Sequence, residues 1–144
     1  MKKETHEIPL YESSSLKQVG AIVLEVTVED SKIVTEVISG QRKGEVFSGT
    51  NHFWNLVSLR EKLEEDGLLL GCSGSQEDLF PGGMLGQTSC GKMMRVFDDN
   101  YHPTEVVSIY APIDLDKIDL LASFGSQKKF RKMWLQQARK GRFY

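Results

Sequence analysis

The chain has 144 residues, of which 40% are hydrophobic and 26% are charged, as in an ordinary globular domain. No apolar run approaches the roughly 18 residues of a membrane-spanning helix, and the charged N-terminus lacks the apolar segment of a signal peptide. With two cysteines and no mark of secretion, the composition favours reduced thiols and a cytoplasmic location.

The net charge of −2 at pH 7 conceals an uneven distribution. Residues 127–144 contain seven Lys and Arg side chains and no acid. The first 126 residues hold the other 11 bases and all 20 acids, which gives this part a net charge of −9. The sequence therefore predicts an acidic body with a basic C-terminal end.

The N-terminal third predicts an antiparallel meander preceded by an arm. Residues 1–18 are polar and contain Pro9, which predicts an extended or irregular arm. Residues 19–28 are rich in β-branched side chains that alternate with polar ones, as in a strand with one buried face. Turns then separate residues 33–39 and 45–48, which predict two further strands.

A helix and a buried strand follow. Within 51–67, one apolar helical stripe is formed at the three-to-four spacing by Phe53, Leu56, either Leu59 or Arg60, and Leu63. We expect Arg60 and Glu64, one turn apart, to lie on the solvated side. The continuous apolar run 68–72 predicts a strand that is covered on both faces.

Residues 71–91 contain six glycines and Pro81. This density predicts a long loop rather than regular structure. Because long loops in compact domains usually carry function, we expect a recognition surface here.

The C-terminal third predicts two strands and a helix. Residues 92–97 and 105–111 have the composition of strands, and residues 126–140 form a helical pattern with aromatic side chains on one face. We therefore predict a single α+β domain over residues 1–144. It would have a mostly antiparallel sheet of five to six strands and two main helices, one central and one C-terminal.

The candidates for catalysis and metal binding lack a supporting pattern. Cys90 lies beside Lys92, and with His52 or His102 it could form a nucleophilic pair, but no motif of a cysteine hydrolase surrounds it. The cysteines and histidines are too scattered for a zinc site. We expect no catalytic residue, no metal and no cofactor.

Acidic pairs point to a binding surface instead. Carboxylates at turns commonly serve only as solvated surface, but together they can form an acidic face for a basic partner, as would suit the neutralisation of a nuclease. The partner-binding residues that we predict are Glu77, Asp78, Phe80, Met84, Asp98 and Asp99.

The basic C-terminal helix offers an alternative. Its cations, interspersed with aromatic residues, could bind the phosphates of a nucleic acid while the aromatic rings stack on bases. The simpler interpretation is a helix with its aromatic side chains packed inward. The nucleic-acid-binding residues under this alternative are Lys128, Lys129, Arg131, Lys132, Arg139, Lys140 and Arg142.

The central stretch also carries a family resemblance. Four segments contribute to it: Asn51-His52-Phe53-Trp54, Leu59-Arg60-Glu61-Lys62-Leu63, Gly67-Leu68-Leu69-Leu70-Gly71-Cys72-Ser73-Gly74 and Pro81-Gly82-Gly83-Met84. They resemble small uncharacterised bacterial proteins, some of which are similar to the immunity proteins encoded beside polymorphic or contact-dependent toxins. Immunity proteins share a role rather than a fold. The resemblance therefore implies a non-enzymatic cytoplasmic protein that binds another protein, such as a cognate toxin, and it transfers no catalytic residue.

Overall fold

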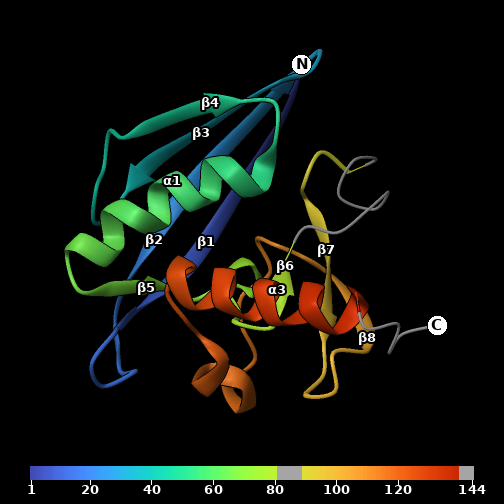
Figure 1. Cartoon of the computed structure of the whole chain (residues 1–144). Helices are drawn as coiled ribbons and strands as arrows, with labels where there is room; N and C mark the ends of the chain where they lie inside the picture. Colours follow the sequence, from blue (N-terminus) through green and yellow to red (C-terminus); the bar gives the residue numbers. More distant parts are fainter. Residues whose placement is uncertain (81–88, 140–144) are drawn as a thin grey trace.

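The computed structural model describes residues 1–80 and 89–139, and it confirms the predicted α+β class with antiparallel sheets. The larger sheet is curled and has five strands in the order β4-β3-β2-β1-β5 (Figure 1). Its strands are β1 (Lys2–Glu12), β2 (Gln18–Glu29), β3 (Lys32–Ser39), β4 (Val46–Gly49) and β5 (Leu68–Leu70). The predicted meander is therefore present as β2-β3-β4.

The polar N-terminal segment forms a strand inside this sheet rather than the predicted arm. β1 pairs with β2 from Lys2 to Tyr11 and with β5 at its C-terminal end. Ile8 and Leu10 face the core and are buried, and Glu4 and His6 extend the same face. The prediction was wrong because only two of these four inward positions are apolar. The alternation of apolar and polar residues that marks a strand is therefore weak in this segment.

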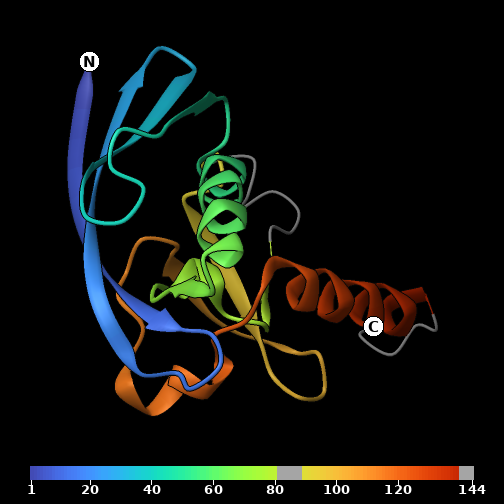
Figure 2. The same ribbon diagram turned by 90° about the vertical axis from the view of Figure 1, so that its left-hand side faces the viewer.

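Helix α1 (His52–Glu65) covers one face of the larger sheet (Figures 1 and 2). Asn51 caps it by accepting a 3.1 Å hydrogen bond from the amide of Trp54. The predicted apolar stripe is buried completely, and Phe53, Leu56 and Leu63 belong to the main hydrophobic core. The position of the central helix and the burial of its apolar stripe were thus predicted correctly.

A smaller antiparallel sheet and a second long helix complete the domain. The strand order is β6-β7-β8, and side chains of both sheets contribute to one core. The remaining elements are β6 (Leu79–Phe80), β7 (Met93–Phe97), β8 (Pro103–Ser108), the 3₁₀ turns η1 (Ser73–Ser75) and η2 (Leu115–Leu120), and helix α3 (Phe124–Arg139). In the described residues, neither long helix combines the length and the apolar character needed to cross a membrane.

The first part of the predicted glycine-rich loop lies inside the protein. Residues 71–76 are all buried, and a Cβ atom on Gly71 would lie only 2.5 Å from the ring of Tyr11. At Gly74 a Cβ atom would lie 2.8 Å from the side chain of Leu56. These glycines therefore allow close packing and do not indicate an exposed loop. Residues 81–88 of the predicted loop lie outside the described residues.

Arg60 is buried beneath α3, contrary to the prediction of a solvated position. The residue is 2% exposed, and its guanidinium donates hydrogen bonds to the carbonyls of Gly74 (3.0 Å) and Ala122 (3.1 Å) and to Oε1 of Gln127 (2.7 Å). Gln127 also donates to the carbonyl of Gly74 at 2.8 Å. Glu64, one turn after Arg60, accepts the amide hydrogen of Phe124 at the start of α3. We call Arg60, Gln127 and the carbonyls that they bind the Arg60 cluster. It fastens α3 to α1 and η1.

Candidate functional site

An acidic face forms at one end of the smaller sheet, where β6 begins and β7 ends. The β6–β7 ladder continues one step beyond the strands, because the amide of Phe97 donates a 2.9 Å hydrogen bond to the carbonyl of Asp78. This contact brings together Asp78 and Phe97, which are 19 positions apart in the sequence. Glu77 directly precedes Asp78, and Asp98 and Asp99 directly follow Phe97, so these acids lie at the same end of the smaller sheet.

The turn after β7 is held in a fixed shape by one of these acids. Oδ1 of Asp98 accepts hydrogen bonds from the amides of Asn100 (2.9 Å) and His102 (3.0 Å). Asp98 therefore shapes the turn as well as adding charge, while the neighbouring Asp99 is exposed. Across the ladder, Asp78 is half-buried, and burial raises the pKa of its carboxyl above the ordinary value.

The turn η2 extends this acidic face. It lies against the start of β6, since the amide of Glu77 donates to the carbonyl of Leu120 at 2.9 Å. Lys117 on η2 forms a 2.8 Å ion pair with Glu105 of β8, and Asp114 and Asp116 lie near enough to act on its charge. We define the acidic face as Glu77, Asp78, Asp98, Asp99, Glu105, Asp114 and Asp116.

An apolar side chain lies within the acidic face. Leu115 stands between Asp114 and Asp116 and is 81% exposed. A large apolar side chain in this position has no role in the core, so it is available as a surface contact. Leu115 is not evident from the sequence, because a single leucine between two aspartates carries no periodic signal.

Two of the predicted partner-binding residues lie elsewhere. Phe80 is only 3% exposed and stacks on Phe97, with the ring centroids 4.4 Å apart. Trp134 of α3 packs edge-on against the Phe80 ring, with the ring centroids 5.4 Å apart. Phe80 therefore belongs to the contact between α3 and the smaller sheet and is not available as a surface contact. Met84 lies outside the described residues.

The basic helix presents a surface of the opposite sign. Gln127, Phe130 and Trp134 face the body, as expected for the inward aromatic face. The exposed cations of the described helix are Lys128, Lys129, Arg131 and Lys132, and none of these four forms an ion pair. Of the other predicted nucleic-acid contacts, Arg139 contributes its backbone to the end of α3, and Lys140 and Arg142 lie outside the described residues.

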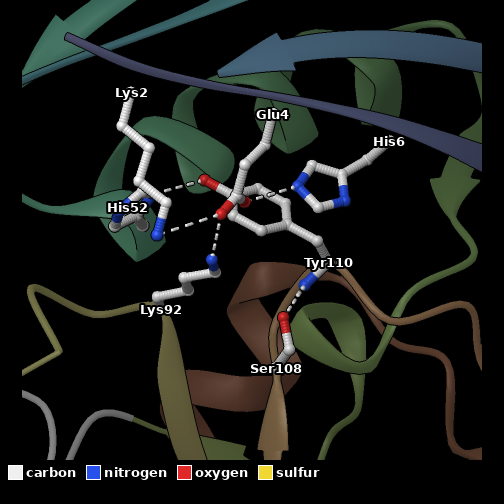
Figure 3. A network of polar contacts seen from close by, with 7 residues as sticks. All are labelled: Lys2, Glu4, His6, His52, Lys92, Ser108 and Tyr110. Atoms are coloured by element: carbon white, nitrogen blue, oxygen red, sulfur yellow. Dashed lines mark hydrogen bonds and ion pairs between the residues drawn. The ribbon is translucent and has the colours of Figure 1, made fainter. Parts of the chain in front are cut away.

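A further polar cluster lies beneath β1 (Figure 3). The carboxylate of Glu4 contacts Lys92 at 2.5 Å, His6 at 3.1 Å and Lys2 at 3.7 Å. The hydrogen bond from Lys92 and the proximity of His6 lower the pKa of Glu4 to about 2, against the opposing effect of burial. Glu4 is therefore a carboxylate at every physiological pH, and it joins β1 to the start of β7.

His52, the first residue of α1, borders this cluster. Its Nδ1 lies 2.7 Å from the hydroxyl of Tyr110, and burial lowers its pKa to about 4. His52 is thus neutral near pH 7. Sequence reasoning missed the cluster because its members come from distant strands, and only the alternation of Glu4 and His6 with apolar residues further along β1 could have indicated it.

A pocket of about 220 Å³ opens beside His52 and also contains Cys90. The amide of His52 donates a 2.7 Å hydrogen bond to the carbonyl of Cys90, so their backbones are in direct contact. Among the described residues, however, the Cys90 thiol and the His52 ring form no hydrogen bond with each other, and His102 lies in the distant β7–β8 turn. The other thiol, Cys72, is completely buried, and burial raises its pKa.

No protein-family model matches the chain, and no curated protein matches its sequence. Within residues 1–80 and 89–139, no three His, Cys, Asp or Glu side chains are grouped so that they could hold a metal ion. Three parts of the described structure are candidates for a functional site: the acidic face, the cationic side of α3, and the pocket beside His52.

Proposed function

We propose that the protein is a non-enzymatic, cytoplasmic bacterial binding protein of the immunity type, which neutralises a basic protein by covering it with the acidic face. The observation that supports this most is the assembly of acids from four separate elements at one end of the smaller sheet. Such a concentration of charge steers a basic partner and selects against acidic ones.

The composition of the face suits a protein partner better than a small ligand. The carboxylates are distributed over the ends of two strands, a turn and η2. Leu115 adds an exposed apolar anchor among them, and a buried anchor surrounded by charged contacts is typical of protein–protein interfaces. The fixed turn at Asp98 reduces the ordering that binding would require.

The test is to capture the partner from the native bacterium with tagged protein, with and without nuclease treatment, and to identify it by mass spectrometry. We expect one stoichiometric basic protein that remains bound after nuclease treatment. Recovery of partners that depend entirely on nucleic acid would contradict the proposal.

The cationic side of α3 supports a second candidate, a nucleic-acid-binding or regulatory domain. The four exposed cations on α3 are not neutralised within the described residues, and Trp54, at the start of the neighbouring α1, is 46% exposed. Salt-dependent binding of an oligonucleotide, lost on reversing the charges of Lys128 and Lys132, would favour this function. Absence of such binding at low salt would exclude it.

A further inference from the structure

The outer edge of β1 is unpaired over its N-terminal half. β2 pairs with the whole of β1 on one side, but on the other side β5 reaches only Leu10, Tyr11 and Glu12. Figures 1 and 2 show β5 beside the C-terminal end of β1 alone, so residues 2–8 form the border of the sheet. An open strand edge is a template for a further strand.

The backbone groups that point outward along this edge can be assigned. The carbonyl of Pro9 accepts the amide hydrogen of Gly71 on the β5 side. Because hydrogen-bonding direction alternates along a strand, the N–H and C=O groups of Lys3, Thr5 and Glu7 point to the same side. None of these groups has a backbone partner on that side in the described chain. Three consecutive outward donor–acceptor pairs are therefore available.

The side chains along this edge are complementary to themselves. The sequence Lys3-Glu4-Thr5-His6-Glu7, paired antiparallel with a second copy about Thr5, places Lys3 opposite Glu7 of the other copy on each side of the centre. Lys3, Thr5 and Glu7 are exposed on the outer face of the sheet. Opposite charges that face each other across strands stabilise pairing, whereas like charges oppose it.

We propose that the β1 edge binds a second copy of this chain, forming a two-fold symmetric dimer in which the two larger sheets become one continuous ten-stranded sheet. Thr5 pairs with Thr5 of the partner copy across the axis, and the two Lys3–Glu7 pairs flank it. All three are the hydrogen-bonded type of antiparallel pair, because their N–H and C=O groups point outward together. The contact is isologous, so it closes at two copies and does not propagate.

The surroundings of the edge leave it open to this pairing. Glu4 and His6 direct their side chains to the inner face, against Lys92 and Tyr110 (Figure 3). The irregularity of the β1–β2 ladder occurs between Leu10 and Tyr11, so the register from residue 2 to residue 8 is uninterrupted. Charged residues on an edge normally discourage sheet extension. Here Lys3 and Glu7 lie at equal distances on either side of Thr5, so in an antiparallel pair of two copies each lysine faces a glutamate.

Charge variants at the edge test the register. Analytical ultracentrifugation of the full chain should show a concentration-dependent dimer. Glu7→Lys puts two cations opposite each other at both flanking positions, so we expect the dissociation constant to rise at least about tenfold. The swap K3E/E7K restores opposite charges and should restore the dimer. Because Lys3 also lies 3.5 Å from Glu25 in its own chain, thermal melting must show that the swapped variant remains folded.

A cysteine pair tests the two-fold axis independently, in a Cys90→Ser background that removes the exposed thiol. Thr5→Cys places two thiols across the axis, where hydrogen-bonded antiparallel residues have Cα atoms about 5.5 Å apart, within the range of a disulfide. Glu7→Cys is the matched control. In the proposed register, position 7 of one copy faces position 3 of the other, so the two cysteines at position 7 would be four residues, roughly 13 Å, apart along the strands.

We expect a disulfide-linked dimer with Thr5→Cys and none with Glu7→Cys under the same oxidising conditions. A protein that remains monomeric at every concentration would overturn the proposal and leave the edge to a strand of another protein. A dimer that crosslinks through position 7, or that is indifferent to Glu7→Lys, would overturn it equally, since the pairing would then be different.

Discussion

The Arg60 cluster and the acidic face hold their charges in opposite ways. In the Arg60 cluster, one buried guanidinium donates hydrogen bonds to two carbonyls and a glutamine, and the residue is almost completely buried. In the acidic face, Lys117 forms an ion pair with Glu105 and lies near Asp114 and Asp116, and six of the seven carboxylates are exposed. Removing an enclosed and hydrogen-bonded group leaves its buried partners unsatisfied, which costs stability. A concentration of unneutralised charges costs stability through repulsion, which a basic partner would relieve. The comparison therefore predicts large effects on stability at Arg60 and large effects on binding at the acidic face.

The largest loss of stability is expected from Arg60→Met. The variant keeps an unbranched side chain of similar length, but it leaves the carbonyl of Ala122 and Oε1 of Gln127 without the Arg60 donor, while the carbonyl of Gly74 keeps its hydrogen bond from Gln127. Because a buried unsatisfied polar group costs about 1–3 kcal/mol, we expect the free energy of unfolding to fall by about 2–6 kcal/mol. Urea denaturation measures this loss, and a change below about 1 kcal/mol would mean that the cluster does not fasten α3.

A smaller effect is expected from pH through His52. Its pKa is about 4 in the folded protein and about 6.5 when unfolded, so below pH 6.5 the unfolded chain binds a proton that the folded chain does not. The contribution of His52 to the free energy of unfolding is therefore complete above pH 6.5, and it is lost as the pH falls towards 4. Between pH 7 and 4.5 this loss amounts to about 2–3 kcal/mol.

The variant His52→Phe isolates this contribution. It removes the titrating group, so the slope of unfolding free energy against pH should become shallower between pH 6.5 and 4.5, whatever the stability at pH 7. Urea titrations at several pH values measure the slope. An unchanged slope would show that another group is responsible for the loss in acid.

The ion pair between Glu4 and Lys92 is expected to contribute less. Both side chains are partly exposed, so solvent screening reduces the effect to about 1 kcal/mol despite the low pKa of Glu4. We expect Glu4→Gln and Lys92→Met each to lower the unfolding free energy by about that amount, and the double variant to lose no more than either alone. Fully additive losses in this double-mutant cycle would indicate that the two side chains do not interact.

The smallest effect on stability is expected at the acidic face. Asp99 and Asp116 are exposed, so the double variant D99K/D116K should change the unfolding free energy by less than about 0.5 kcal/mol. Thermal denaturation checks this expectation. A large loss of stability would mean that these carboxylates support the fold and would weaken the case for a binding surface.

The sequence predicted those elements whose own residues carry the pattern. Helix α1 was evident from the spacing of Phe53, Leu56 and Leu63, and strands β2 and β3 from their alternating β-branched residues. β1 was missed because Glu4 and His6 occupy inward positions and are satisfied by Lys92 and Tyr110, far away in the sequence.

The candidate site was predictable only in part, for the same reason. Glu77, Asp78, Asp98 and Asp99 were identified as acidic pairs at turns, but their proximity depends on the β6–β7 register, which no local pattern contains. The burial of Arg60 and Phe80 likewise follows from the packing of α3, because both residues contact that helix. Leu115 became a candidate only when its exposure was known.

The most direct test of the proposed function is a calorimetric titration of the captured partner with three proteins: the unaltered chain, D99K/D116K, and the matched control E29K/E61K. Glu29 and Glu61 are exposed acids outside the acidic face, so both variants have the same net charge. We expect D99K/D116K to weaken binding at least about tenfold and E29K/E61K to bind almost as the unaltered chain does. Equal weakening by both variants, or by neither, would contradict a partner site at the acidic face.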